Sequence, residues 1–152
     1  MRGKSRRTVE DRYVLDAYSL LAFLEGERGG EKVKGLLERT GTRLYMSVVN
    51  LGEVYYILLR ERGRDAAELM LSDFRQAAQV SLVGVTWERA RAAAELKARG
   101  GISYADCFAA ALAAEKGALL VTGDREFEGV ADTVKIMWIH GTADDRGGAA
   151  GG

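Results

Sequence analysis

The 152-residue sequence contains no proline, one cysteine and one histidine, and these absences exclude several kinds of site. Because Cys107 is the only thiol, the chain cannot form an internal disulfide, which suits folding in a reducing cytoplasm. Because His140 is the only imidazole, there is no material for a histidine-based zinc site or catalytic triad. Without proline, glycine and small polar residues must mark the turns.

Long apolar runs and net charge are also missing. No stretch approaches the roughly 18 apolar residues of a membrane span, and the basic N-terminus has no apolar run behind it, so we expect neither a membrane protein nor an exported one. A net charge of zero argues against binding nucleic acid by bulk attraction. Positive side chains do gather at one end, namely Arg2, Lys4, Arg6, Arg7 and Arg12.

Three segments follow from these patterns. Residues 1–11 are expected to be a flexible basic leader, and phosphate contact by its cations is an open alternative. Residues 12–139 have the length and composition of a single globular domain. Residues 140–152 are rich in glycine, alanine and aspartate without periodicity, which predicts a disordered tail outside the fold.

Strand-like and helix-like patterns alternate within the domain. Ser47 and Thr86 are placed to cap helices, while Gly63 and the pair at 100–101 end them. Residues 104–116 carry alanine on nearly every face, which predicts a helix packed on both sides. The alternation predicts an α/β fold with a mostly parallel sheet. The expected strands are 13–15, 42–46, 79–85, 118–121 and 134–139, and the expected helices are 19–25, 31–39, 48–59, 64–76, 87–99 and 104–116.

Four acidic residues fall where such a fold would bring them together. Asp16 directly follows the first strand, and Asp124 follows the strand at 118–121 after a short step. In open parallel sheets the ligand crevice lies outside the carboxyl ends of the strands. Glu53 and Asp106 lie near the starts of apolar helices, where the helix macrodipole favours a carboxylate. We therefore expect all four at one edge of the sheet.

Each acid also has a purely structural explanation. Asp16 and Asp124 could be turn residues, because aspartate hydrogen-bonds its own following backbone. Asp106 stands three residues after Ser103, in a capping-box pattern. Glu53 could pair with Arg60 or with another basic residue on the same exposed helix face.

If the four acids do converge, they cannot all remain ionised unaided. Two carboxylates about 4 Å apart repel by roughly 4 kcal/mol at an effective dielectric of about 20. An all-oxygen site of this kind favours Mg²⁺, or Mn²⁺, over zinc. Such ions orient phosphates and activate water in nucleases, so the pattern points to phosphodiester hydrolysis.

Four sequence elements resemble the PIN domain and, more narrowly, the VapC toxins of toxin–antitoxin pairs. They are residues 14–19, 47–54, 103–110 and 120–127, and the acids within them are spaced by 37, 53 and 18 residues. The resemblance spans about residues 13–139 and implies a three-layer α/β/α sandwich. It also implies a metal-dependent endoribonuclease acting on RNA, with tRNA and rRNA as candidate substrates, commonly a homodimer and held inactive by a VapB-like antitoxin.

The resemblance also assigns residue roles. Asp16 and Asp106 would be the principal ligands of Mg²⁺ or Mn²⁺. Glu53 and Asp124 would complete the acidic cluster, with Glu53 assisting the attacking water. Ser19 and Thr122 would supply hydroxyl contacts nearby.

The sequence also bears on three competing functions. A HAD-type phosphatase needs a second acid two residues after the first, where this chain has Tyr18. A receiver domain needs a lysine after a late strand, whereas Lys135 precedes the last one. A non-catalytic PIN-fold module that binds RNA or protein stays open, and replacing Asp106 with asparagine would separate it from an enzyme.

Overall fold

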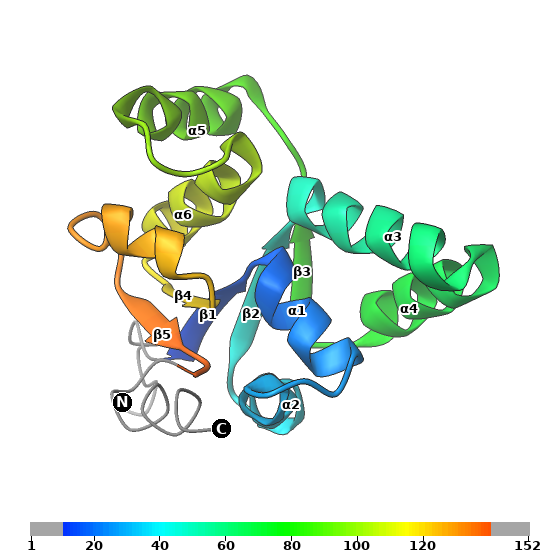
Figure 1. Ribbon diagram of the computed structural model, residues 1–152. Coiled ribbons are helices and arrows are strands. Elements are labelled where there is room, and N and C mark those ends of the chain that lie inside the picture. Colours follow the sequence, from blue (N-terminus) through cyan, green and yellow to red (C-terminus); the bar gives the residue numbers. More distant parts are fainter. Residues whose placement is uncertain (1–10, 141–152) are drawn as a thin grey trace, which may run out of the picture.

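The computed structural model describes residues 11–140 and has a five-stranded parallel sheet at its centre (Figure 1). The spatial order of its strands is β3-β2-β1-β4-β5, and every neighbouring pair is parallel. The elements in chain order are β1 (Arg12–Leu15), α1 (Ala17–Leu24), α2 (Gly30–Glu38), β2 (Arg43–Ser47), α3 (Val48–Arg62), α4 (Arg64–Gln76), β3 (Val80–Val83), α5 (Trp87–Arg99), α6 (Tyr104–Lys116), β4 (Leu119–Thr122), the 3₁₀ helix η2 (Arg125–Val130) and β5 (Ile136–Trp138).

Side chains alternate along the strands between two separate apolar cores. In β1, Tyr13 and Leu15 pack on the face covered by α1, α2, α3 and α4, whereas Val14 packs on the face covered by α5, α6 and η2. In β4, Val121 faces the first core and Leu120 the second. Because both faces are covered, the central strands are apolar throughout, as in other parallel sheets. The result is a three-layer α/β/α sandwich.

The strand order places a topological switch between β1 and β4. The chain builds outward from β1 through β2 to β3, then returns across the sheet to add β4 and β5 on the other side of β1. The connections leaving the carboxyl ends of β1 and β4 therefore diverge, which leaves a crevice between them. This crevice is where the first and last predicted acids belong.

The sequence predicted most of this architecture. Helices α4, α5 and α6 have the expected bounds, and Ser47 and Thr86 cap α3 and α5 by accepting hydrogen bonds from the N–H groups of Val49 and Arg89. The predicted strand at 79–85 is shorter, because pairing with β2 ends where Ser47 turns into α3. The prediction that α6 is packed on both sides is wrong in part, since Ala114 and Glu115 are exposed.

The predicted leader and tail fall largely outside the described residues, which begin at Asp11 and end at His140. His140, assigned to the tail from sequence, is placed and shares a hydrogen bond of 2.9 Å with the Tyr18 hydroxyl. Between residues 11 and 140, no helix combines the length and the apolar character that a membrane crossing requires.

Candidate active site

Asp16 is fixed at the carboxyl end of β1 by two hydrogen bonds to its carboxylate. Leu15 pairs with Val121, which sets Asp16 opposite Thr122 at the end of β4. The Thr122 hydroxyl donates to Asp16 Oδ2 at 2.5 Å, and the Ser19 N–H donates to Oδ1 at 2.8 Å. The Ser19 hydroxyl is held in turn by the Asp16 backbone, which completes a capping box at the start of α1.

The environment of Asp16 opposes its ionisation. Its side chain is 1% exposed, and this burial raises its pKa from 3.8 to about 7, against the lowering effect of the bonds from Thr122 and Ser19. The negative charge of Asp106 raises the pKa further. Each Asp16 oxygen accepts one hydrogen bond and so retains a lone pair for a cation.

Asp106, Asp124 and Glu126 form the densest group of carboxylates among residues 11–140, with one oxygen from each within 4.8 Å of the others. Asp124 caps η2 by accepting a hydrogen bond of 2.9 Å from the Glu126 N–H, which brings both acids to the start of this short helix. The Thr122 hydroxyl accepts a bond of 3.0 Å from the Asp124 N–H. Thr122 therefore links Asp16 to the loop that carries Asp124.

Asp106 enters the same group from the first turn of α6. Ser103 caps this helix and accepts a hydrogen bond of 3.0 Å from the Asp106 N–H, and its side chain also contacts the Asp106 carboxylate. Burial raises the pKa of Asp106 to about 6, and the charges of Asp124, Glu53 and Glu126 add to this increase. The first turn of α6 thus adds a third carboxylate to those of Asp124 and Glu126.

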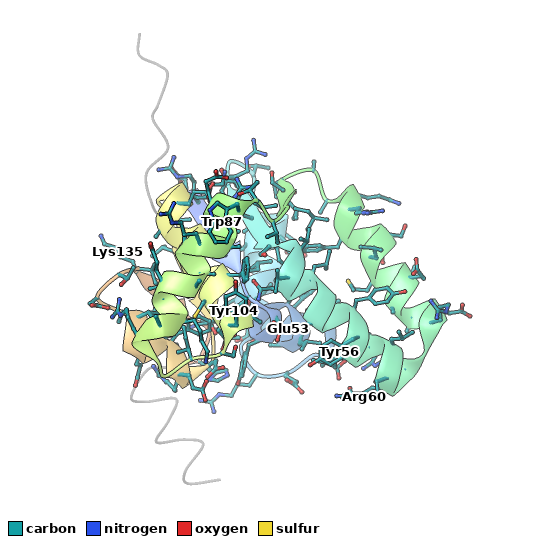
Figure 2. The ribbon with its side chains drawn as sticks, turned by 90° about the horizontal axis from the view of Figure 1, so that it is seen from above. Glu53, Tyr56, Arg60, Trp87, Tyr104 and Lys135 are labelled. Carbon is teal, nitrogen blue, oxygen red and sulfur yellow. The ribbon has the colours of Figure 1, made fainter. Side chains whose placement is uncertain are left out.

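Glu53 is oriented by a buried asparagine that joins two helices. Asn50, which has no exposed surface, donates through Nδ2 to Glu53 Oε1 at 3.2 Å and to the carbonyl of Ala105 at 3.0 Å. This amide ties α3 to the start of α6, directly before Asp106. Figure 2 shows Glu53 between α3 and the pair of helices α5 and α6. Asn50 Oδ1 is buried and finds no hydrogen-bond partner between residues 11 and 140.

A hard divalent cation fits this set of donors. All the donors are carboxylate oxygens, and the charges of neighbouring acids add to the effect of burial in raising the pKa values of Asp16 and Asp106. Within residues 11–140, the one thiol, Cys107, is fully buried in the core, and the one imidazole, His140, shares a hydrogen bond with Tyr18. Oxygen-only sites of this kind suit Mg²⁺ or Mn²⁺.

The structure brings the predicted residues to one edge of the sheet and adds two that sequence reasoning missed. Asp16 and Asp124 are helix caps, which agrees with their structural explanation. Asp124 belongs to the group with Asp106 and Glu126, whereas Asp16 lies outside that group and is joined to its loop through Thr122. The predicted alternative of a Glu53–Arg60 pair is wrong, because Arg60 lies over the ring of Tyr56. The missed residues are Glu126 and Asn50; a second acid two residues after Asp124 was the available signal for Glu126.

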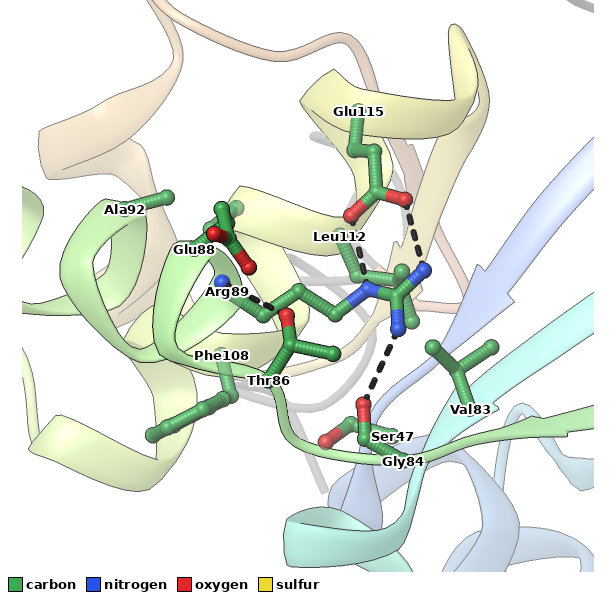
Figure 3. A pocket seen from close by; sticks show the side chains of 11 residues that line it. Ser47, Val83, Gly84, Thr86, Glu88, Arg89, Ala92, Phe108, Leu112 and Glu115 are labelled. Carbon is green, nitrogen blue, oxygen red and sulfur yellow. Dashed lines mark hydrogen bonds and ion pairs between the residues drawn. The ribbon is translucent and has the colours of Figure 1, made fainter.

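A separate hollow of about 480 Å³ lies near the carboxyl ends of β2 and β3, between α5 and α6 (Figure 3). Arg89 crosses it and donates to both carboxylate oxygens of Glu115, at 3.0 and 2.9 Å, and to the carbonyl of Gly84 at 3.2 Å. None of the clustered acids lines this hollow. Within it, Arg89 and Glu115 are paired with each other.

Solved structures share this fold. VapC20 of Mycobacterium tuberculosis, described as a sarcin-ricin loop cleaving toxin, is similar with a TM-score of 0.64 and 24% identity over 78% of this chain and 94% of that one. A chain of the DNA-bound VapBC complex of Salmonella typhimurium is similar with a TM-score of 0.65 and 18% identity. The match covers 84% of this chain and 98% of that one. PAE2754 of Pyrobaculum aerophilum is similar with a TM-score of 0.55 and 22% identity. The match covers 84% of this chain and 89% of that one.

Sequence comparison identifies the family. A search of curated proteins finds no match to this chain. The family model described as the PIN domain matches residues 13–133, a span that begins in β1 and includes all the clustered acids. The chain belongs to the PIN domain family.

Proposed function

We propose that this chain is a metal-dependent endoribonuclease of the VapC type, the toxin of a toxin–antitoxin pair. The observation that carries the proposal is the convergence of Asp106, Asp124 and Glu126 at the strand edge that also holds Asp16. A module that only bound RNA would gain nothing from this charge, because uncompensated carboxylates repel a phosphate backbone. The similar structures of VapC and VapBC chains agree with the proposal.

The residues divide the work of phosphodiester hydrolysis as follows. Asp16, Asp106 and Asp124 would hold Mg²⁺ or Mn²⁺, with Glu126 as a fourth acid. When bound, the cation would stabilise negative charge on the phosphate and lower the pKa of a water molecule. Ser19 and Thr122 keep the Asp16 carboxylate in one orientation.

Glu53 is the best-placed acid to orient the attacking water. Its Oε1 is fixed by Asn50, which leaves the other oxygen to accept a proton from water. The water oxygen would form a new bond to phosphorus while one backbone P–O bond breaks, so that one RNA strand gives two fragments.

Cleavage of total RNA by the purified protein tests the proposal. We expect discrete cuts with Mg²⁺ or Mn²⁺ that disappear with EDTA and in Asp106→Asn, and sequencing the new ends would identify the RNA, with tRNA and rRNA as candidates. Glu115→Gln, a change to a paired acid on the same helix, should cut normally. Intact RNA under every metal, from folded protein free of a copurified inhibitor, would leave the non-catalytic binding module as the better explanation.

An antitoxin partner is part of the proposal. Several similar structures are toxin–antitoxin complexes, including VapBC-1 of Haemophilus influenzae and FitAB bound to DNA. We infer that a VapB-like protein would bind this chain in the cytoplasm and block cleavage. Coexpression with the product of an adjacent reading frame should yield a stable complex and remove the RNA cuts, and unchanged cutting would count against it.

A homodimer is also proposed, and an exposed apolar patch supports it. Val48, Val85, Trp87 and Tyr104 are exposed near the starts of α3, α5 and α6, and Trp87 is 68% exposed. Figure 2 shows Trp87 and Tyr104 on the same side of the molecule. Analytical ultracentrifugation should find a dimer that Trp87→Glu dissociates and Leu69→Glu, at an exposed site on α4, does not. A wild-type monomer at all concentrations would exclude it.

A further inference from the structure

Tyr18 lies at the acidic cluster but belongs to none of the functions assigned above. It is two residues from Asp16 in the first turn of α1, and its side chain is 40% exposed although Asp16 and Ser19 beside it are buried. Its hydroxyl shares a hydrogen bond of 2.9 Å with Nε2 of His140, 122 residues away in sequence. An exposed ring with an anchored hydroxyl has a defined orientation.

The Tyr18–His140 pair is pressed against the loop that carries Asp124. A Cβ atom at Gly123 would come within 2.7 Å of His140 Nε2 and closer still to the Tyr18 ring, so only glycine allows this approach. The two rings are tilted by 56° with centroids 5.6 Å apart, an arrangement in which neither ring covers the face of the other. The pair therefore forms a wall at one side of the cluster.

The charges around Tyr18 decide what such a wall can contact. Two of the acids lie beside Tyr18, because Asp16 precedes it by two residues and Asp124 directly follows Gly123, against which the Tyr18 ring packs. An anionic phosphate would be repelled at this position. A neutral nucleobase would not be repelled, and aromatic rings stack on bases with little regard to their identity.

We propose that Tyr18, held by His140, stacks on the nucleobase that flanks the scissile phosphate and so positions single-stranded RNA at the acidic cluster. The inference rests on the proposed ribonuclease function and names the substrate contact of the same site. Tyr18 touches a base and takes no part in bond breaking. His140 is a positioning residue that acts through the tyrosine hydroxyl.

The test is RNA binding in the Asp106→Asn background, where cleavage is blocked. A labelled single-stranded oligonucleotide spanning a mapped cut is titrated, and anisotropy gives its Kd. Tyr18→Ala and Tyr18→Leu should each raise Kd by about 5- to 100-fold, because both remove the aromatic face. Tyr18→Phe and His140→Ala should raise it by less than about fivefold and by no more in combination, since both break the same contact. Leu69→Ala should change nothing.

Oligonucleotides with single abasic positions provide a readout that a structural role would not affect. At one position beside the cut, removing the base should weaken binding by Asp106→Asn but not by Asp106→Asn with Tyr18→Ala. Full rescue by leucine, an unchanged Kd in Tyr18→Ala, or equal abasic losses in both proteins would overturn the inference. These results differ from failure of the proposed function, in which wild-type protein with Mg²⁺ or Mn²⁺ would leave RNA intact.

Discussion

Helix α6 carries two carboxylates whose environments are opposite. Asp106 lies in the first turn, where the helix macrodipole should lower its pKa, yet burial and the charges of Asp124, Glu53 and Glu126 raise it. Glu115 lies near the last turn, where the macrodipole should raise its pKa, yet hydrogen bonds from Arg89 lower it. Local partners therefore outweigh the macrodipole at both ends. Glu115 is paired with the guanidinium of Arg89, whereas Asp106 is surrounded by other carboxylates. A metal ion would therefore be stabilised beside Asp106 and not beside Glu115.

Removing each carboxylate in turn gives the largest contrast. Asp106→Asn should lower the kcat for RNA cleavage by at least about 100-fold, because an amide binds a divalent cation poorly. Glu115→Gln should leave kcat within about twofold of wild type. Both rates are measured on the same RNA with Mg²⁺ or Mn²⁺. Equal losses in the two variants would mean that the difference in environment has no catalytic meaning.

The raised pKa of Asp16 predicts an unusual dependence of stability on pH in the absence of metal. A carboxyl group with a pKa of 3.8 when unfolded and about 7 when folded binds its proton more tightly in the folded state. The free energy of unfolding should therefore fall as the pH rises from about 4 to about 7, by about 4 kcal/mol for Asp16 alone. Urea unfolding in EDTA at pH 5 and pH 8 should show about 3 kcal/mol of this difference, because the unfolded carboxyl is already ionised at pH 5.

Two controls isolate Asp16 in that experiment. Asp16→Asn keeps an acceptor for the Ser19 N–H without the charge, so it should be more stable than wild type at pH 8 in EDTA and should flatten the pH profile. Mg²⁺ or Mn²⁺ should stabilise the wild type at pH 8 and stabilise Asp16→Asn much less. A wild-type profile that matches the variant would contradict the assignment.

Replacing Asn50, which orients Glu53 beside the acidic cluster, should have a smaller effect on cleavage. Asn50→Ala removes the donor that orients Glu53 and the link to Ala105, so cleavage should fall by about 10-fold, as for other groups that orient a metal site or its water. The metal affinity measured by Mn²⁺ titration should change less than kcat. If cleavage and thermal stability fall together and metal binding is lost, Asn50 serves packing rather than orientation.

The smallest effect on stability and activity should come from breaking the Arg89–Glu115 ion pair. Arg89→Gln breaks the bidentate contact with Glu115, which is partly exposed, so the free energy of unfolding should fall by less than about 1 kcal/mol. RNA cleavage should be unchanged. Thermal unfolding and the cleavage assay together measure both, and a large loss of activity would show that the hollow beside α5 takes part in the function.

The sequence predicted the layered fold and the placement of the four acids toward one edge of the sheet, because both depend on local pattern and chain order. The apolar run ending at Asp16 and the run before Asp124 required parallel strands, and parallel strands place such residues at one edge. Glu126 was missed because nothing in the sequence shows that the backbone turns after Asp124 into η2, which directs both acids to the same place. Asn50 was missed because a buried amide is recognised only by its partners.

By itself, the sequence determined the alternation of strands and helices, the capping residues and the order of the acids along the chain. Only the tertiary structure decided which charges are neutralised. Glu115 and Asp106 are both acids on one alanine-rich helix, and their difference depends on Arg89 and Asp124, which lie 26 and 18 residues away from them. Electrostatic energy depends on separation in space and on burial, and the sequence records neither.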